Sequence, residues 1–300
     1  MGALQDFCLE KHIALRQGEP LCKHTTFKIG GPADWFALPD NVEKLSALLT
    51  YAGKRGIRTV VIGRGSNLLA PDEGFRGLVI TTANLNGCVL SEANEIEAGA
   101  GILLSQLSAF AARQGLTGLE FAQGIPGSAG GAVVMNAGAY DGEIAFVLQS
   151  SSVLLPDGTV RLFSKQEHQL GYRSSYFKTH PEAVVLSSRF TLQAGKREEI
   201  ESKMADLARR RREKQPLEYP SAGSAYKRPQ GHFAGALIEQ CGLRGRQIGG
   251  ARVSDKHAGF IVNVGGATAR DVLRLMEEIE KTVAERTGVV LEREIRLLGG

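Results

Sequence analysis

A short segment in the last third of the chain carries the residue types of a small-molecule active site. Within residues 219–229, Ser221 and Ser224 flank Gly223, and Lys227 follows three residues after Ser224. Glycine lets the backbone approach a ligand closely, and a hydroxyl can donate a proton when a neighbouring group tunes it. A lysine can hold a phosphate as a point charge. The segment indicates a site for a phosphorylated substrate, although a Ser/Gly turn ended by proline would have the same composition.

A glycine-rich loop at Gly63-Arg64-Gly65-Ser66-Asn67 directly follows an apolar strand-like run. Backbone N–H groups in such a loop can cradle a pyrophosphate, and Ser66 and Asn67 can add side-chain hydrogen bonds. The loop is neither a dinucleotide fingerprint, because position 68 is leucine, nor a Walker loop, because no Gly-Lys-Ser/Thr follows. Taken alone, it is more typical of a tight turn at a strand exit.

A second glycine loop is a stronger indication of a ligand site. It runs Gly124-Ile125-Pro126-Gly127-Ser128-Ala129-Gly130-Gly131 and continues to a small-residue stretch from Asn136 to Tyr140. So many small residues would form a wall almost free of side chains, which suits a flat ring or a diphosphate pressed against backbone. Two separate glycine loops suggest one long ligand, with each loop holding a different part of it.

Bulk properties exclude several classes of function. The net charge of +4 suits a small anionic ligand, and the basic run Arg209–Arg212 continues a helical pattern without an aromatic platform for nucleic acid. The four cysteines form no CxxC pair and the six histidines show no zinc spacing, so we expect no metal site. The sequence contains no apolar run of about 20 residues and no export signal, so it predicts a cytoplasmic protein without membrane insertion.

The pattern of elements favours an α+β fold with more than one domain. Helices are expected at 41–55, 103–113, 196–214, 232–241 and 271–286, and strands at 58–62, 77–82, 258–263 and 290–298, with a hairpin at 153–160 around Asp157-Gly158. A capping box of Thr268 and Asp271 begins the last helix, and Gly288 ends it. Alternation in the last strand places Leu291, Ile295 and Leu297 on one face. These elements lack the regular alternation of a doubly wound sheet. A change in composition at 194–196 is the best candidate for a domain boundary.

Together these motifs resemble the UDP-N-acetylenolpyruvoylglucosamine reductase family, the FAD-dependent reductases of peptidoglycan precursor synthesis. The resemblance covers nearly the whole chain. It runs through the two glycine loops and five further motifs, in the family's order, at residues 25–33, 172–178, 221–229, 251–263 and 291–296. It implies the vanillyl-alcohol-oxidase (PCMH-type) FAD-binding fold over residues 1–198, in subdomains of about 1–84 and 85–198. A C-terminal α+β substrate-binding domain would follow at 199–300, its final strand returning toward the flavin.

The resemblance also implies the reaction. NADPH would reduce FAD, the flavin N5 would pass hydride to C3 of the enolpyruvyl ether, and C2 would be protonated to give UDP-N-acetylmuramate. Arg173 and Glu294 would polarise the substrate carboxylate and Ser224 would supply the proton. An arginine suits a carboxylate because its fork donates two parallel hydrogen bonds, whereas a carboxylic acid can help only when protonated.

Further site residues follow from the same resemblance. The cofactor would be held by the two glycine loops and Asn136, and the UDP part by Tyr226, Lys227 and, more loosely, Lys214. Arg228 stands where the family usually has Asn, next to the nucleotide contacts. The short stretch after Phe177 places the chain in the branch without a tyrosine lid.

Two other interpretations stay open from the sequence. A flavin oxidase of the same fold would keep the FAD loops but would have no use for Ser224, Lys227 and Glu294. A nucleotide-binding scaffold with degenerate catalysis would bind no flavin. For the reductase, the expected partners are two small molecules, the UDP-sugar substrate and NADPH, and the protein would be a monomer or a weak oligomer.

Overall fold

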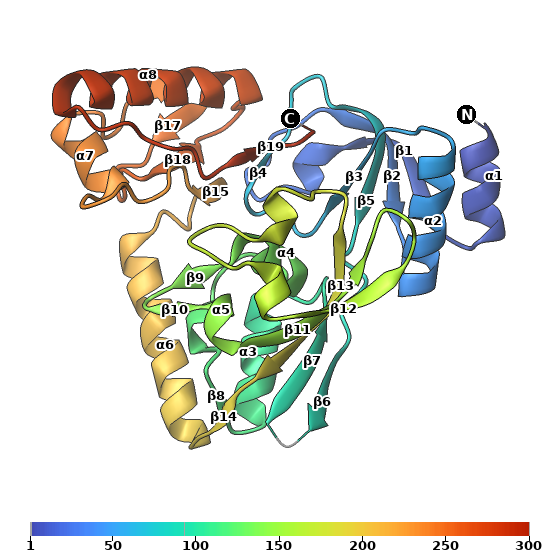
Figure 1. Cartoon of the computed structure of the whole chain (residues 1–300). Coiled ribbons are helices and arrows are strands. Elements are labelled where there is room, and N and C mark those ends of the chain that lie inside the picture. Colours follow the sequence, from blue (N-terminus) through green and yellow to red (C-terminus); the bar gives the residue numbers. More distant parts are fainter. Residues whose placement is uncertain (1, 93, 300) are drawn as a thin grey trace. The chain divides into compact units, whose positions relative to one another are not determined.

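The computed structural model describes residues 2–92 and 94–299, which group into two compact units (Figure 1). The first comprises residues 2–17, 35–64 and 77–210, and the second comprises 18–34, 65–76 and 211–299. This grouping differs from the contiguous division at 198/199 that the sequence predicts. The early segments join the second unit because Phe27, Ile29 and Leu69 are buried in one cluster with the side chains of its C-terminal helices.

The first unit contains two larger sheets. One has the strand order β1 (Ala14–Pro20), β2 (Pro32–Leu38), β5 (Phe75–Thr81) and β3 (Thr59–Ile62), and its β3–β5 pair is parallel. The helices α1 (Gly2–Glu10) and α2 (Val42–Lys54) accompany it, and Phe7 stacks on Tyr51 with ring centroids 4.0 Å apart. The structure confirms the predicted helix, with Asn41 as its N-cap: its side chain accepts from the Lys44 N–H.

The other sheet has five strands in the order β12 (Val160–Ser164), β11 (Leu148–Leu154), β13 (Val184–Thr191), β7 (Glu95–Gly99) and β6 (Cys88–Glu92). The predicted hairpin joins β11 to β12, and the Asp157 carboxylate accepts the Thr159 N–H in its turn. Four helices belong to this part of the chain: α3 (Leu104–Arg113), α4 (Ala129–Met135), α5 (Ile144–Val147) and α6 (Arg197–Lys214). Short elements complete it: β8 (Leu116–Thr117) with β14 (Gln193–Ala194), β9 (Gly138–Ala139) with β10 (Gly142–Glu143), and the 3-10 turns at Glu120–Ala122, Gln166–His168 and Tyr176–Lys178.

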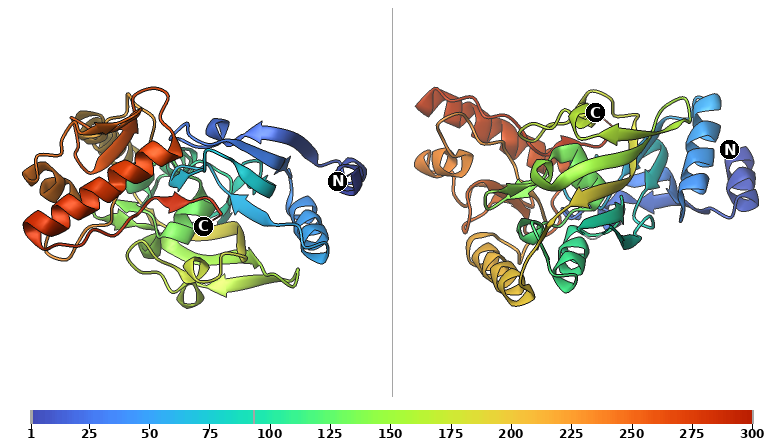
Figure 2. Two further views of the ribbon diagram at one scale, coloured as in Figure 1. Left: turned by 90° about the horizontal axis from the view of Figure 1, so that it is seen from above. Right: turned by 60° about the horizontal axis from the view of Figure 1, so that its bottom comes forward.

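In the second unit, a four-stranded sheet has the order β15 (Ser221–Ser224), β18 (Phe260–Asn263), β17 (Ala251–Val253) and β16 (Gln247–Ile248). The helix α8 (Ala269–Thr287) lies along this sheet, as Figures 1 and 2 show, and α7 (Ala234–Gln240) packs beside it. The predicted capping box of Thr268 and Asp271 begins α8, and Gly288 ends it with φ +73°. The remaining elements are the 3-10 turn Leu21–Lys23 and the parallel pair β4 (Leu68–Leu69) and β19 (Arg296–Leu297).

A buried histidine links the five-stranded sheet to the 3-10 turn beyond β12. The His168 side chain is fully buried, and its Nδ1 donates to the Ser164 carbonyl at 2.8 Å. Its Nε2 therefore accepts from the Ser151 hydroxyl at 2.9 Å, which in turn accepts from Ser188 at 2.8 Å. Burial lowers the pKa of His168, so the folded state favours the neutral ring.

We expect His168 to make the protein less stable in mild acid. Below the ordinary histidine pKa of about 6.5, the unfolded chain takes up a proton that the folded chain resists. The free energy of unfolding should therefore keep its full value above that pH. It should fall as the pH is lowered toward about 5, and His168 should account for at most about 1.4 kcal/mol of this fall per pH unit. Denaturant titrations of the protein and of His168→Gln, at several pH values, measure this. His257, whose pKa burial also lowers, remains in both proteins, and an identical slope for the two would contradict the assignment.

Candidate active site

The second glycine loop is anchored to residues 100–104, which lead into α3. The Gly127 carbonyl accepts the Leu104 N–H at 3.0 Å, and the N–H groups of Ala129 and Gly130 donate to Ile102 and Ala100, both at 2.9 Å. A Cβ on Gly130 would lie 2.7 Å from the Ala100 Cβ, so only glycine permits this approach. The loop is therefore a rigid, side-chain-poor surface, as the sequence predicts.

Ser128 supplies an unused hydroxyl at the start of α4. It occupies the N-cap position, where a serine side chain ordinarily accepts a helix N–H, but it makes no capping hydrogen bond. Its Oγ is buried without a partner, although a buried hydroxyl normally has one. A Cβ on Gly63, from the first glycine loop, would lie 2.5 Å from this Oγ, so the two loops meet at Ser128.

Two further buried polar atoms without hydrogen-bond partners belong to the same loops. They are the Nε of Arg64 and the Oε1 of Gln123, which directly precedes Gly124. Among the described residues, the Arg64 guanidinium makes a long contact with the Gly101 carbonyl, at 3.5 Å. The two loops thus hold a guanidinium, an amide and a hydroxyl whose hydrogen-bonding capacity is not used within the protein. Such groups around glycine backbone fit an anionic, ring-bearing ligand such as FAD. Sequence reasoning missed Gln123, since its only signal is its place beside the loop.

Gly63→Ala tests whether the loops meet in this way. The new Cβ would overlap the Ser128 hydroxyl, so we expect the flavin-free protein to lose about 1–3 kcal/mol of unfolding free energy. Ser128→Ala removes that oxygen, and the nearest remaining side-chain atom, the Ser128 Cβ, lies 3.8 Å away. The double variant should therefore recover most of the loss in denaturant titrations. Additive losses would contradict the contact.

Asn136 is committed to the fold rather than to a ligand. It ends α4 with φ +40°, its Nδ2 donates to the Gly171 carbonyl at 3.0 Å, and its Oδ1 accepts the Ala145 N–H at 2.9 Å. This side chain therefore does not favour the predicted cofactor contact. It holds the turn of residues 171–174, in which Arg173 has φ +51° and donates to the Gly138 carbonyl at 3.0 Å. Arg173 is thus presented from a fixed turn of the first unit.

The rest of the first glycine loop belongs to the second unit. Gly65 has φ +62°, and a Cβ there would lie 2.1 Å from the His24 carbonyl oxygen, so the position requires glycine. Ser66 is half-buried. Asn67 donates from its Nδ2 to the main-chain carbonyl of Glu294 at 3.1 Å. The predicted cofactor loop is therefore bonded directly to a predicted catalytic residue.

Ser224 and Glu294 are brought together by antiparallel pairing of their segments. Tyr226 pairs with Arg293, the Lys227 N–H donates to the Glu292 carbonyl at 2.8 Å, and the Glu294 N–H donates to the Ala225 carbonyl at 2.9 Å. Ser224 precedes this pairing at the end of β15, after an irregularity at Gly223, which has φ +79°. Two of the three residues that the resemblance assigns to catalysis therefore lie on adjacent, hydrogen-bonded segments of one unit.

Tyr226 does not fit its predicted contact with UDP. Its side chain is 3% exposed, and its hydroxyl donates to the Met276 carbonyl on α8 at 2.9 Å. Tyr226 stands beside an ion pair in which the Arg293 Nε lies 2.5 Å from the Glu280 Oε1. Burial raises the pKa of Tyr226. Sequence reasoning could not separate this tyrosine from a ligand contact, because its burial depends on α8, fifty residues later. Its role is structural.

The other predicted nucleotide contacts remain accessible to different degrees. The Lys227 ammonium pairs with the Glu292 carboxylate, and its side chain is 15% exposed. The Arg228 guanidinium lies 3.9 Å from the centroid of the Phe233 ring, which is itself exposed. Lys214 is exposed at the end of α6. A cation over an exposed aromatic ring is a surface on which a nucleotide base can stack.

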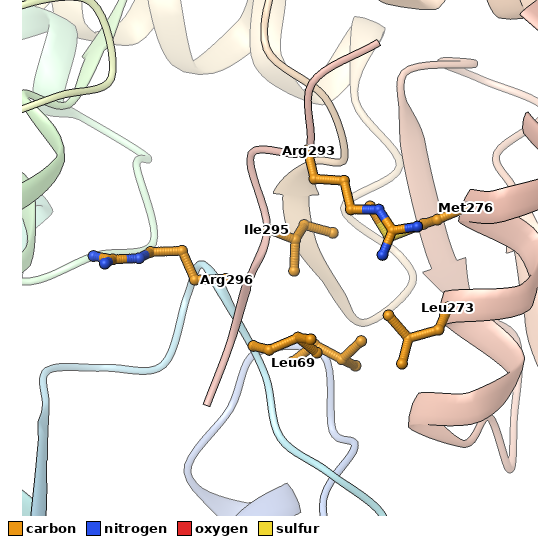
Figure 3. Close-up of a pocket in the computed structure, with 7 residues that line it drawn as sticks. Leu69, Leu273, Met276, Arg293, Ile295 and Arg296 are labelled. Carbon is orange, nitrogen blue, oxygen red and sulfur yellow. The ribbon is translucent and has the colours of Figure 1, made fainter. Parts of the chain in front are cut away.

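The expected continuous strand at 290–298 is wrong. Only Arg296 and Leu297 form a strand, and it pairs in parallel with β4, directly after the first glycine loop. Side chains do not alternate as predicted, since Ile295 is buried but Leu297 is 45% exposed. A cavity of about 270 Å³ borders this segment (Figure 3), and it is lined by Leu69, Leu273, Met276, Arg293, Ile295, Arg296 and Leu297.

Comparison with known proteins decides the family. Residues 215–298 match the family described as "UDP-N-acetylenolpyruvoylglucosamine reductase, C-terminal domain", and residues 33–164 match "FAD binding domain". A UDP-N-acetylenolpyruvoylglucosamine reductase of Agathobacter rectalis is 50% identical over 96% of this chain and 95% of its own length. One from Lachnoclostridium phytofermentans is 47% identical over 94% and 92%. This chain belongs to the UDP-N-acetylenolpyruvoylglucosamine reductase family.

A solved structure supports the same assignment. The crystal structure of the UDP-N-acetylenolpyruvylglucosamine reductase of Thermus caldophilus matches with a TM-score of 0.80 and 37% identity, over 95% of this chain and 98% of that one. The chain is therefore a flavin-dependent oxidoreductase of this reductase family, and the predicted α+β architecture with a PCMH-type FAD-binding fold is confirmed. Within residues 2–92 and 94–299, no helix is long and apolar enough to cross a membrane, and no three metal-ligating side chains cluster.

Proposed function

We propose that this reductase converts UDP-N-acetylglucosamine enolpyruvate into UDP-N-acetylmuramate, with NADPH as the reductant and FAD as the carrier. The observation that carries the proposal is the hydrogen-bonded pairing of residues 225–227 with 292–294, which brings Ser224 next to Glu294. The unsatisfied polar atoms of Arg64, Gln123 and Ser128 support a flavin site in the glycine loops. FAD, when bound, supplies the hydride that reduces C3 of the enolpyruvyl group after NADPH has reduced the flavin.

The residues of this chain then handle the charge and the proton. Reduction at C3 places negative charge on C2, delocalised into the substrate carboxylate as an enolate. The Arg173 fork can donate two hydrogen bonds to that carboxylate, and Glu294, in its acid form, can donate one more. The Ser224 hydroxyl gives its proton to C2 and recovers one from solvent. Serine is a weak acid, so its proton transfer depends on the high basicity of the enolate carbon.

Substrate binding would use the cationic side chains beyond Ser224. Lys227 and Lys214 suit the diphosphate as point charges. Arg228 stands where an asparagine is usual in the family, and with Phe233 it would contribute charge and ring surface at the nucleotide end. We also propose a cytoplasmic location, which the four unpaired cysteines among the described residues favour.

The visible spectrum and NADPH oxidation of the purified protein test the proposal. A flavin spectrum should be present, and NADPH oxidation should accelerate strongly when the enolpyruvyl nucleotide is added, with one nucleotide reduced per NADPH. NADPH oxidation that proceeds equally without the nucleotide would indicate a flavin oxidase of the same fold. A colourless protein that binds the nucleotide would indicate a scaffold, and either result would overturn the reductase assignment.

A further inference from the structure

Asn67 forms hydrogen bonds to the backbone on both sides of Ile295, in the terminal segment. Its side-chain Nδ2 donates to the Glu294 carbonyl at 3.1 Å, and its main-chain carbonyl accepts the Arg296 N–H at 3.0 Å. Ile295 is enclosed between these two bonds. Because Asn67 is also the last residue of the first glycine loop, one residue joins that loop to the backbone of Glu294.

Packing holds Ile295 but not the residues around it. Ile295 is buried in the core of the second unit, whereas Leu297 is 45% exposed, and both border the cavity of about 270 Å³. The strand that follows Glu294 has two residues. Hydrogen bonds to the backbone of Glu294 therefore contribute to its position: the Ala225 carbonyl accepts its N–H, and the Asn67 side chain donates to its carbonyl.

We propose that Asn67 is a positioning residue for Glu294, and that it couples the cofactor loop to the acid that faces the substrate. The inference rests on the proposed function and adds to it a residue whose side chain acts through Glu294 rather than on the cofactor. Without the Nδ2–H donor, the peptide that follows Glu294 can rotate and displace the carboxyl group. Displacements of about 1 Å can cost about 10²-fold in rate.

Asn67→Ala should therefore separate the two half-reactions of the flavin-loaded enzyme. In stopped-flow measurements of flavin absorbance, reoxidation by the enolpyruvyl nucleotide should slow by about 10- to 100-fold. Flavin reduction by NADPH should stay within about threefold of the unaltered enzyme, because it does not use Glu294. The affinity for FAD, measured by fluorescence titration of the flavin-free protein, should also change by less than about threefold.

Asn67→Asp gives a sharper version of the test. The two side chains have the same shape, but an ionised carboxylate cannot donate to the Glu294 carbonyl and repels it, whereas a protonated one can donate. Near neutral pH, where the carboxylate is ionised, the reoxidation defect of Asn67→Asp should therefore be at least as large as that of Asn67→Ala. A normal reoxidation rate for Asn67→Asp would contradict the role of the Nδ2–H donor.

Gln247→Ala is the matched control. It removes a bond of the same kind in the same unit, from Nε2 to the Gly249 carbonyl at 2.8 Å, and should leave both half-reactions unchanged. Equal losses in both half-reactions for Asn67→Ala, or a loss confined to FAD affinity, would overturn the inference and make Asn67 a cofactor ligand or a purely structural residue. Unaltered enzyme that is not reoxidised by the nucleotide would instead refute the proposed function, and the inference with it.

Discussion

Ser224→Ala should slow reoxidation of the reduced flavin by the enolpyruvyl nucleotide by about 10²–10⁴-fold, the usual contribution of a positioned general acid. Reduction of the flavin by NADPH should be nearly unaffected, since it needs no proton at C2. The defect should appear in kcat more than in KM, because the Ser224 proton moves only as the transition state forms. Stopped-flow absorbance of the flavin measures both half-reactions in one sample.

Ser221→Ala is a close control for this variant. Ser221 lies on the same strand, three residues earlier, and its main-chain carbonyl accepts the Thr26 hydroxyl at 2.7 Å. The substitution keeps that bond and removes only the side-chain hydroxyl, so both half-reactions should stay within about threefold of the unaltered enzyme. Equal defects in Ser221→Ala and Ser224→Ala would contradict Ser224 as the specific proton donor.

Arg173→Ala should lower kcat/KM for the nucleotide by about 10²–10³-fold, because it removes the cation that we propose to stabilise the developing enolate. Arg173→Lys should recover only part of this loss, since lysine keeps the charge but not the two-pronged donor. Alanine and lysine suffer comparable strain at φ +51°. The difference between the two variants therefore reports on the side chain rather than on the turn.

Arg161→Ala serves as the control for the loss of an arginine. Arg161 pairs with Glu167 at 2.8 Å on the exposed strand β12, within the same unit, and its removal should leave steady-state kinetics unchanged. If Arg173→Lys were as active as the unaltered enzyme, a bidentate contact with the substrate carboxylate would be excluded.

Local patterns predict well those elements whose boundaries are determined by nearby residues. The capping box of Thr268 and Asp271, the helix end at Gly288 and the turn at Asp157 all depend on contacts within a few positions, and the structure confirms each of them. The glycine loops were likewise visible, because a close backbone approach leaves few residue types possible at positions such as Gly65.

Features that depend on distant residues were not predictable in the same way. The sequence of the terminal segment alternates as in a strand. In the structure, however, its pairing partners are few and far away in sequence: Tyr226 on one side and Leu68–Leu69 on the other. The burial of Tyr226 depends on α8, and the hydrogen bond from Asn67 to Glu294 joins residues 227 positions apart. No local pattern encodes such pairings, so the composition of the second unit could only come from the structure.

The second unit combines early and late segments of the chain, and this has a consequence for its synthesis on the ribosome. Phe27, Ile29 and Leu69 are made early, but their core includes Leu291 and Ile295 from the end of the chain. Leu69 must wait for roughly 220 further residues, which takes roughly 10–45 s at ~5–20 residues per second. During that time these apolar side chains lack their native partners while the first unit can already fold. A nascent chain that stalls before residue 291 would therefore expose a hydrophobic surface that chaperones can bind.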